Sequence, residues 1–230
     1  MGLLGDIHGN HLALQAVLNA AHTQRVERLL ITGDLIGYYF WPKEVLELLA
    51  PWNIEVVRGN HEEMLARARR NPSFLREVER RYGSGLRVAI ETLFLPQLDW
   101  LETLPHPRKI DIDECGILLC HGSPLDLNQY VYPDAACADT DRFFEMDCDW
   151  IVFGHTHHPM ERQCGTVTIV NPGSVGQPRN RQPGAHWMVL DTNHRTIHKR
   201  IESYDIDWVI EQSRGRHPNL TYLGDVLGRI

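Results

Sequence analysis

The chain has 230 residues, of which 43% are hydrophobic and 23% are charged, and its formal net charge is −7. This length can bury a large core, and this composition is that of an ordinary globular protein, which excludes disorder and collagen-like structure. The sequence contains no run of about 18 apolar residues, so we expect no membrane-spanning helix. The acidic balance provides no broad basic surface, so we expect no nucleic-acid partner.

Short apolar runs predict buried strands, and helical patterns lie between them. The predicted strands cover residues 1–4, 29–31, 54–57, 117–120 and 150–153. Asn10 is suited to cap a first helix, and a second helix should begin at Pro42. Alternation of strands and helices predicts an α/β fold with a largely buried sheet.

Residues 62–104 interrupt this alternation with a helical insertion that is rich in arginine. It is either a cap beside a site or a solvated helical face whose arginines pair with Glu77 and Glu79. Further strands are expected at 167–170, 187–190 and 196–201, and the last two should form an antiparallel hairpin that completes a second sheet. A helical tail should begin near residue 205, and residues 1–230 are expected to form a single domain.

Polar clusters follow nearly every predicted strand. In chain order they are Asp6-Ile7-His8-Gly9-Asn10, Gly33-Asp34, Gly59-Asn60-His61-Glu62, His121-Gly122 and Gly154-His155-Thr156-His157. Ligands of open α/β sheets gather at the carboxyl ends of the strands, so these clusters are predicted to converge. The spacing of two residues within the first and last clusters should project each pair to one side of an extended backbone.

The residue types in these clusters predict a metal site. Carboxylate, amide and imidazole groups together suit Mn, Fe, Zn or Ni, whereas calcium would take oxygen ligands throughout. No cysteine stands in the clusters, which argues against a structural zinc site. Taken singly, Asn10 is explained by a helix cap and His121 by a satisfied core histidine; the ordered set favours metal.

The ordered motifs Asp-x-His, Gly-Asp, Gly-Asn-His-Glu, His-Gly and Gly-His-x-His resemble those of the calcineurin-like metallophosphoesterase superfamily. The segment 171–179 (NPGSVGQPR) resembles the small bacterial and archaeal phosphodiesterase-like branch. The resemblance covers residues 1 to about 200. It implies a four-layer α/β/β/α sandwich with two mixed sheets flanked by helices.

The resemblance also implies roles for individual residues. The first metal would be held by Asp6, His8 and His157, the second by Asn60, His121 and His155, and both by a bridging Asp34. The two divalent ions would be Mn²⁺ in first place, with Fe, Zn or Ni as alternatives, and a hydroxide between them would attack phosphorus. His61 would protonate the leaving group, although Gly37 stands where related phosphatases carry the carboxylate that orients this histidine.

Arg58, Arg181 and Asn10 are candidate phosphate contacts, with surface ion pairs as the alternative for the two arginines. The function expected is a phosphodiesterase acting on a small or nucleotide-like phosphoester. The alternatives are a phosphomonoesterase or protein phosphatase, a dinucleoside polyphosphate hydrolase, and a non-catalytic metal-binding scaffold for other proteins. Retention of His61 and of all seven ligand positions argues against the scaffold.

Two further expectations concern the setting of the protein. Five cysteines, an odd number with no Cys-x-x-Cys motif, favour reduced thiols and a cytoplasmic location, and the first residues do not have the pattern of a secretory signal. A monomer and a homodimer both remain open.

Overall fold

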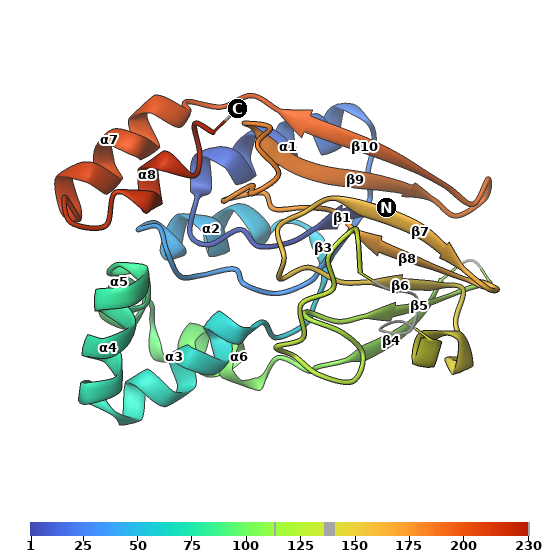
Figure 1. Cartoon of the computed structure of the whole chain (residues 1–230), viewed down its shortest axis with the longest axis horizontal. Helices are drawn as coiled ribbons and strands as arrows, with labels where there is room; N and C mark the ends of the chain where they lie inside the picture. The colour runs from blue at the N-terminus through green and yellow to red at the C-terminus, as the bar shows by residue number, and fades with distance from the viewer. Residues whose placement is uncertain (113, 136–140, 230) are drawn as a thin grey trace.

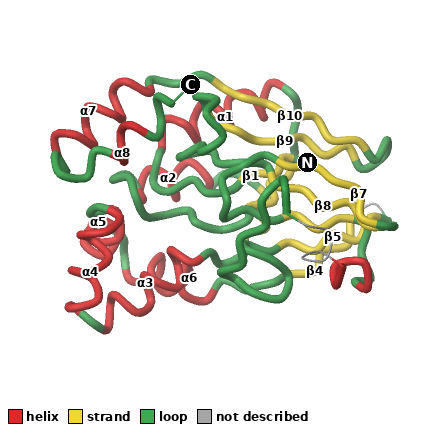
Figure 2. Tube along the Cα trace, viewed as in Figure 1, coloured by secondary structure: helices red, strands yellow, loops and turns green. Residues whose placement is uncertain are grey.

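The protein is a mixed α/β sandwich, known from a computed structural model that describes residues 1–112, 114–135 and 141–229 (Figure 1). Within these ranges the strands form two five-stranded mixed sheets, and helices flank them. Figure 2 shows most of the helices gathered at one end of the view and the strands at the other, with loops meeting between them. The fold expected from the motifs is confirmed.

The first sheet contains the three parallel strands expected from the N-terminal quarter of the sequence. Its order is β10 (Thr196–Glu202), β9 (Ala185–Asp191), β1 (Gly2–Leu4), β2 (Arg28–Ile31) and β3 (Asn53–Val56). β1, β2 and β3 pair in parallel, whereas β9 pairs antiparallel with both β1 and β10. The carboxyl ends of β1 to β3 therefore lie at one edge of the sheet.

The second sheet is also built around three parallel strands. Its order is β4 (Arg108–Ile112), β5 (Cys115–Leu119), β6 (Trp150–Val152), β8 (Val167–Asn171) and β7 (Met160–Cys164). β5, β6 and β8 are parallel, and antiparallel β4 and β7 form the two edges. Neither edge strand was predicted, because each is only five residues long and three of the five residues are polar, so no clear alternation distinguishes it from a loop.

The hairpin of β9 and β10 corrects one expectation, because it completes the first sheet and not the second. Leu3 of β1 pairs with Met188 of β9. After β8 the chain crosses between the sheets, where the backbone N–H groups of Val175 and Gly176 donate to the carbonyls of Gly5 and Asp6 at 2.9 and 3.0 Å. The crossing delivers the next strand beside β1, and strand periodicity carries no information on that choice of partner.

Three buried apolar clusters hold the sheets and helices together. Inward-facing residues of both sheets, such as Leu3 and Leu30 from the first and Ile117 and Val152 from the second, form one buried cluster. A second cluster lies between the opposite face of the first sheet and the helices. The opposite face of the second sheet is covered by Val131 and by the short 3-10 helix η2 (Asp141–Glu145), among others.

The first two helices begin where the sequence predicts them, after the Asn10 cap and at Pro42. The helices are α1 (His11–Thr23), α2 (Pro42–Leu49), α3 (Asn60–Arg70), α4 (Pro72–Tyr82), α5 (Gly85–Thr92), α6 (Leu95–Thr103), α7 (Ile206–Arg216) and α8 (Tyr222–Asp225). None of the helices in the described ranges is long and apolar enough to cross a membrane. α3 to α6 occupy the arginine-rich stretch, where Arg87 pairs with Glu79 and Arg70 with Glu102 of α6. These pairs account for part of its positive charge within the helical face itself.

Candidate metal centre

The carboxyl ends of the parallel strands of both sheets converge on one site. Asp6 and His8 follow β1, Asp34 follows β2 and Asn60 follows β3, while the second sheet adds His121 after β5 and the pair His155 and His157 after β6. All of these side chains except Asn60 are buried, with at most 6% of their surface exposed. The structure thus brings together the seven residues that the motifs single out.

Five of these residues adopt left-handed backbone conformations. The φ angles are 53° at Asp6, 52° at His8, 53° at Asp34, 66° at His155 and 61° at His157. The expectation that each pair projects from an extended backbone is therefore wrong, because tight turns aim these side chains. Residues other than glycine adopt such conformations at an energetic cost, and they cluster at functional sites, where the surrounding structure enforces them.

His8, His157 and Asp6 form the first half of the centre. The Nε2 atoms of His8 and His157 lie 3.1 Å apart, and Nε2 of His157 is 3.5 Å from Oδ1 of Asp6. Nδ1 of His8 faces the carbonyl of Ile36 at 3.2 Å, and Nδ1 of His157 faces that of Gln177 at 2.6 Å. A carbonyl only accepts, so each Nδ1 carries the hydrogen and each Nε2 of the neutral ring presents a lone pair. Two lone pairs and a carboxylate aimed at one another fit a cation between them.

His121, Asn60 and His155 form the second half by the same logic. Nε2 of His121 is 2.9 Å from Oδ1 of Asn60 and 3.1 Å from Nδ1 of His155. Its own Nδ1 donates to the carbonyl of Thr32 at 2.8 Å, which leaves the lone pair on Nε2. Carbonyl partners of this kind fix the ring orientation of metal-binding histidines.

Asp34 lies between the two halves. Its Oδ2 atom is 3.5 Å from Nε2 of His121 and 3.7 Å from Nε2 of His8. Its other oxygen, Oδ1, accepts a hydrogen bond from the backbone N–H of His61 at 2.8 Å. One carboxylate oxygen facing a histidine of each half is the arrangement that a bridging ligand requires.

Without bound metal, burial determines whether these side chains are charged. It lowers the pKa of His8, His121 and His157 well below the ordinary value, and with the charge of Arg179 it lowers that of His155 to about 4. Neutral rings cannot form ion pairs with Asp6 and Asp34. The short distances between these rings and the two carboxylates are therefore those expected of groups that bind a common metal ion. Burial also raises the pKa of Asp6 to about 8, a cost that bound cations would offset. The donor set fits divalent metal ions.

Glu62 supports the centre from behind. This fully buried carboxylate accepts hydrogen bonds from the backbone N–H groups of Asp34, Leu35 and Gly59 at 2.8–2.9 Å. It therefore ties the turn that carries Asp34 to the turn that precedes Asn60. These contacts also show that Glu62 does not orient His61.

His61 is held by rings and not by a carboxylate. A Cβ atom at Gly37 would lie 2.0 Å from Nδ1 of His61, so the absence of a side chain at position 37 makes room for the imidazole. Its ring centroid lies 4.8 Å from that of Tyr38, 5.6 Å from that of Tyr82 and 4.7 Å from that of His8. Burial, followed by the charge of Arg179, lowers the pKa of His61 to about 3, so the ring is neutral in the chain alone.

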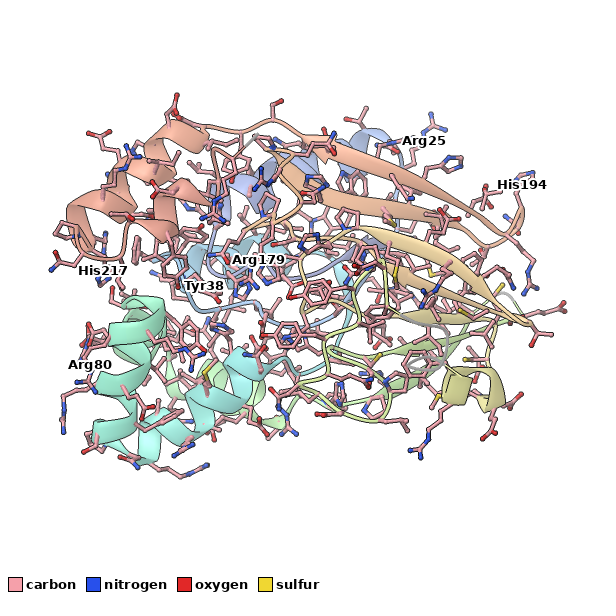
Figure 3. The ribbon with its side chains drawn as sticks, in the orientation of Figure 1. Arg25, Tyr38, Arg80, Arg179, His194 and His217 are labelled. Carbon is pink, nitrogen blue, oxygen red and sulfur yellow. The ribbon has the colours of Figure 1, made fainter. Side chains whose placement is uncertain are left out.

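A narrow cavity of about 40 Å³ opens over the metal centre. The described residues lining it are Asp34, Tyr38, Asn60, His61, Tyr82, Tyr130, His155, His157 and Arg179. The guanidinium of Arg179 donates to the Tyr38 hydroxyl at 3.0 Å and to Oε1 of Gln177 at 2.9 Å, which fixes it beside the centre. Figure 3 shows Tyr38 and Arg179 together in the middle of the molecule.

Arg179 is the site residue that sequence reasoning missed, since Arg58, Arg181 and Asn10 were considered in its place. Arg179 ends the segment 171–179, which was the available signal. The described lining of the cavity includes none of those three residues. Arg181 is exposed, and Asn10 caps α1 by accepting from Ala13 N–H at 3.2 Å while it donates to the carbonyl of Gly176 at 3.0 Å.

Comparisons with known proteins show which family the chain resembles. A model of the calcineurin-like phosphoesterase superfamily domain matches residues 1–195. The chain is 28% identical over 198 residues, 83% of its length and 86% of the relative's, to a protein of Methanothermobacter thermautotrophicus named "Probable metallophosphoesterase". Among solved structures, a metallophosphoesterase from Sphaerobacter thermophilus is similar with 27% identity and a TM-score of 0.80, covering 100% of this chain and 99% of the other.

A hypothetical protein from Pyrococcus horikoshii shares the fold with a TM-score of 0.87 at 21% identity, covering 100% of this chain and 97% of that one. The fold and the site define a metal-dependent phosphoester hydrolase. The chain belongs to the calcineurin-like phosphoesterase superfamily. The family expected from the order of the motifs is thereby confirmed.

Proposed function

We propose that this protein is a phosphodiesterase with two divalent metal ions, acting on a small or nucleotide-like phosphoester. The observation that carries the proposal is the position of Asp34 Oδ2, which faces both His8 of one ligand group and His121 of the other. Asp6, His8 and His157 would hold the first ion, and Asn60, His121 and His155 the second. We propose Mn²⁺ for both, with Fe, Zn and Ni as alternatives that the same donors accept.

When bound, the two ions would supply an electrophilic clamp on the phosphoryl oxygens and lower the pKa of a bound water. The protein supplies the remaining functions. Arg179, fixed by Tyr38 and Gln177, donates to a phosphoryl oxygen and stabilises the charge that develops there. Its guanidinium also helps to hold the phosphoryl group in line for attack.

His61 is proposed to protonate the leaving oxygen. Its ring packs against those of Tyr38 and His8, which also contact each other, at the wall of the cavity. A phosphate anion in the cavity would favour the protonated imidazole and oppose the lowering of its pKa by burial. Substrate binding would therefore favour the protonated form of His61, which is the form that can donate a proton to the leaving oxygen.

One feature favours a diester over a monoester. The two proposed ions would contact the phosphoryl oxygens of either class of ester. Beyond them, Arg179 is the cationic side chain in the described lining of the cavity, and a diester carries one negative charge where a monoester carries two near neutral pH. The tyrosines around Arg179 add rings and hydroxyl groups but no further positive charge. A phosphomonoesterase is the second candidate, and comparison of the two substrate classes decides between them.

The test is hydrolysis of bis-p-nitrophenyl phosphate by Mn²⁺-loaded protein, compared with p-nitrophenyl phosphate. Replacement of His61 by alanine should lower kcat by about 10²- to 10⁴-fold with two metals still bound, whereas His194→Ala, a surface histidine that contacts Asp191, should change neither. Unchanged turnover in His61→Ala would remove the general acid.

Asp34→Asn tests the bridge. Elemental analysis should find fewer ions at both positions, and two ions per chain in that variant would exclude the bridging role. If the protein is a non-catalytic scaffold, it should bind metal at full occupancy and hydrolyse neither substrate when loaded with Mn, Fe, Zn or Ni.

A further inference from the structure

Two exposed tyrosines lie beside the metal centre and have no part in the mechanism above. Tyr130 and Tyr132 expose 53% and 41% of their surface in the loop that follows β5. Their ring planes are 11° from parallel, with centroids 5.9 Å apart. Exposed rings of this size are costly to leave in water, so a pair aligned next to a site requires an explanation.

The pair continues the metal centre outward. The ring centroid of Tyr130 is 4.1 Å from that of His155, a member of the second ligand group, and Tyr130 also lines the cavity. On the far side, Tyr132 lies 5.6 Å from the ring of His158. A row of rings therefore leads from the ligand group to the surface.

The loop holds the two rings in place. Val131, between them in sequence, is 1% exposed and packs in the core outside the second sheet. With the middle residue anchored inward, the side chains on either side of it are presented outward together. The loop is tightened further by Ser123, whose Oγ accepts from the backbone N–H groups of Leu125 and Asp126 at 3.2 and 3.0 Å. The platform exists before any ligand arrives.

The opposite wall of the cavity is closed by comparison. Tyr38 is 6% exposed and packs against His61 and Tyr82. A phosphoester whose phosphoryl group contacts Arg179 must therefore extend its remaining part along the open side, past Tyr130. What extends there meets the exposed aromatic surface of Tyr130 and Tyr132.

We propose that Tyr130 and Tyr132 form a stacking platform for the base of a nucleotide whose phosphoryl group lies at the metal centre. The inference rests on the proposed function and names the substrate class for that site. Stacking between bases and aromatic side chains tolerates any base, because every base has a π face. A nucleotide suits a platform of two rings because its sugar separates the base from phosphorus, whereas the ring of an aryl ester is joined through one oxygen and reaches Tyr130 alone.

The test compares two ligands that differ only in the base, adenosine 5′-monophosphate and ribose 5-phosphate, by calorimetry on Mn²⁺-loaded protein. The nucleotide should bind about 5- to 150-fold more tightly, the contribution of one stacked base. Tyr130→Ala should remove most of this ratio, because the affinity for adenosine 5′-monophosphate should fall by more than the affinity for ribose 5-phosphate. Tyr130→Phe, which retains the ring without the hydroxyl, should preserve the ratio and serves as the matched control.

Each other outcome overturns a defined part of the reasoning. Equal affinities for the two ligands in the wild-type protein, or a ratio that survives Tyr130→Ala, would exclude the platform while hydrolysis of bis-p-nitrophenyl phosphate leaves the proposed function intact. Equal losses of affinity for phenyl phosphate and adenosine 5′-monophosphate in Tyr130→Ala, together with no loss for the nucleotide in Tyr132→Ala, would exclude the two-ring platform and assign Tyr130 to aryl esters. Failure to bind either sugar phosphate, together with no hydrolysis, would overturn both proposals.

Discussion

Removal of the Glu62 carboxylate should weaken both the fold and the metal centre. Three buried backbone N–H groups, those of Asp34, Leu35 and Gly59, donate to it at 2.8–2.9 Å. An orphaned buried donor costs about 1–3 kcal/mol. Three donors, reduced by partial relaxation and by relief from burying the carboxylate, lead us to expect a loss of about 3–5 kcal/mol in the free energy of unfolding for Glu62→Ala.

Glu62→Gln should lose less, about 2–3 kcal/mol, because the amide keeps one accepting oxygen and turns a donor towards another N–H group. For a chain of this size, the loss in Glu62→Ala corresponds to a fall in Tm of about 6–20 °C. Since the turns that carry Asp34 and Asn60 lose their common tie, Mn²⁺ affinity should also fall by about 10- to 100-fold.

The assays are urea denaturation, thermal unfolding and metal titration, with Glu63 as the matched control. Glu63 is the next residue of α3 and is exposed, so Glu63→Gln should change stability by at most about 1 kcal/mol through its place in the first turn. If Glu62→Gln matched Glu63→Gln in both unfolding and Mn²⁺ affinity, the supporting role of Glu62 would be wrong.

Three further predictions follow from the site. Arg179→Ala should lower kcat/KM for a diester by about 10²- to 10³-fold with both ions retained. Arg179→Lys should recover only part of this activity, because lysine lacks the planar guanidinium group. Equal activity of wild type and Arg179→Ala would show that Arg179 does not bind the phosphoryl group. Gly37→Ala should displace His61 and lower kcat towards that of His61→Ala, because the added Cβ would lie 2.0 Å from Nδ1 and φ is 94° there; wild-type kcat would contradict this geometry. Chelation of the metals should lower Tm, since Mn²⁺ at about 100 times its Kd stabilises the folded state by about 2.7 kcal/mol, and a Tm unaffected by chelator would show that the ions do not bind the folded chain.

Much of the site could be predicted from the sequence because its residues follow strands. A buried apolar run ends at a known position, and the polar residues after it must lie at the edge of the sheet. Convergence of Asp6 and Asp34 follows from that rule alone, because they end neighbouring parallel strands of the first sheet. His121 ends a strand of the second sheet and joins them because the two sheets pack together. The glycines next to these residues and the histidine spacing in Gly154-His155-Thr156-His157 sharpened it to a metal site.

The spacing of the ligand residues in the sequence did not predict how their side chains are oriented. Asp6 and His8 were expected to share a side of an extended backbone, whereas both have left-handed φ angles near 50°. A left-handed conformation of a non-glycine residue is enforced by the surrounding structure and has no reliable local signature. The same holds for the packing of His61 against Tyr38 and Tyr82 in the space that Gly37 leaves.

The sequence by itself determined the family, the order of the strands in the chain and the residues that can bind metal, because these depend on residue type and on neighbours along the chain. The tertiary structure alone decided that the hairpin of β9 and β10 joins the first sheet, that Arg179 faces the cavity and that Tyr130 stacks beside His155. Arg179 contacts Tyr38 across 141 positions of sequence, and the partners Leu3 of β1 and Met188 of β9 are even further apart in the chain. Contacts at such separation depend on how two sheets pack, and no local pattern of residues encodes that packing.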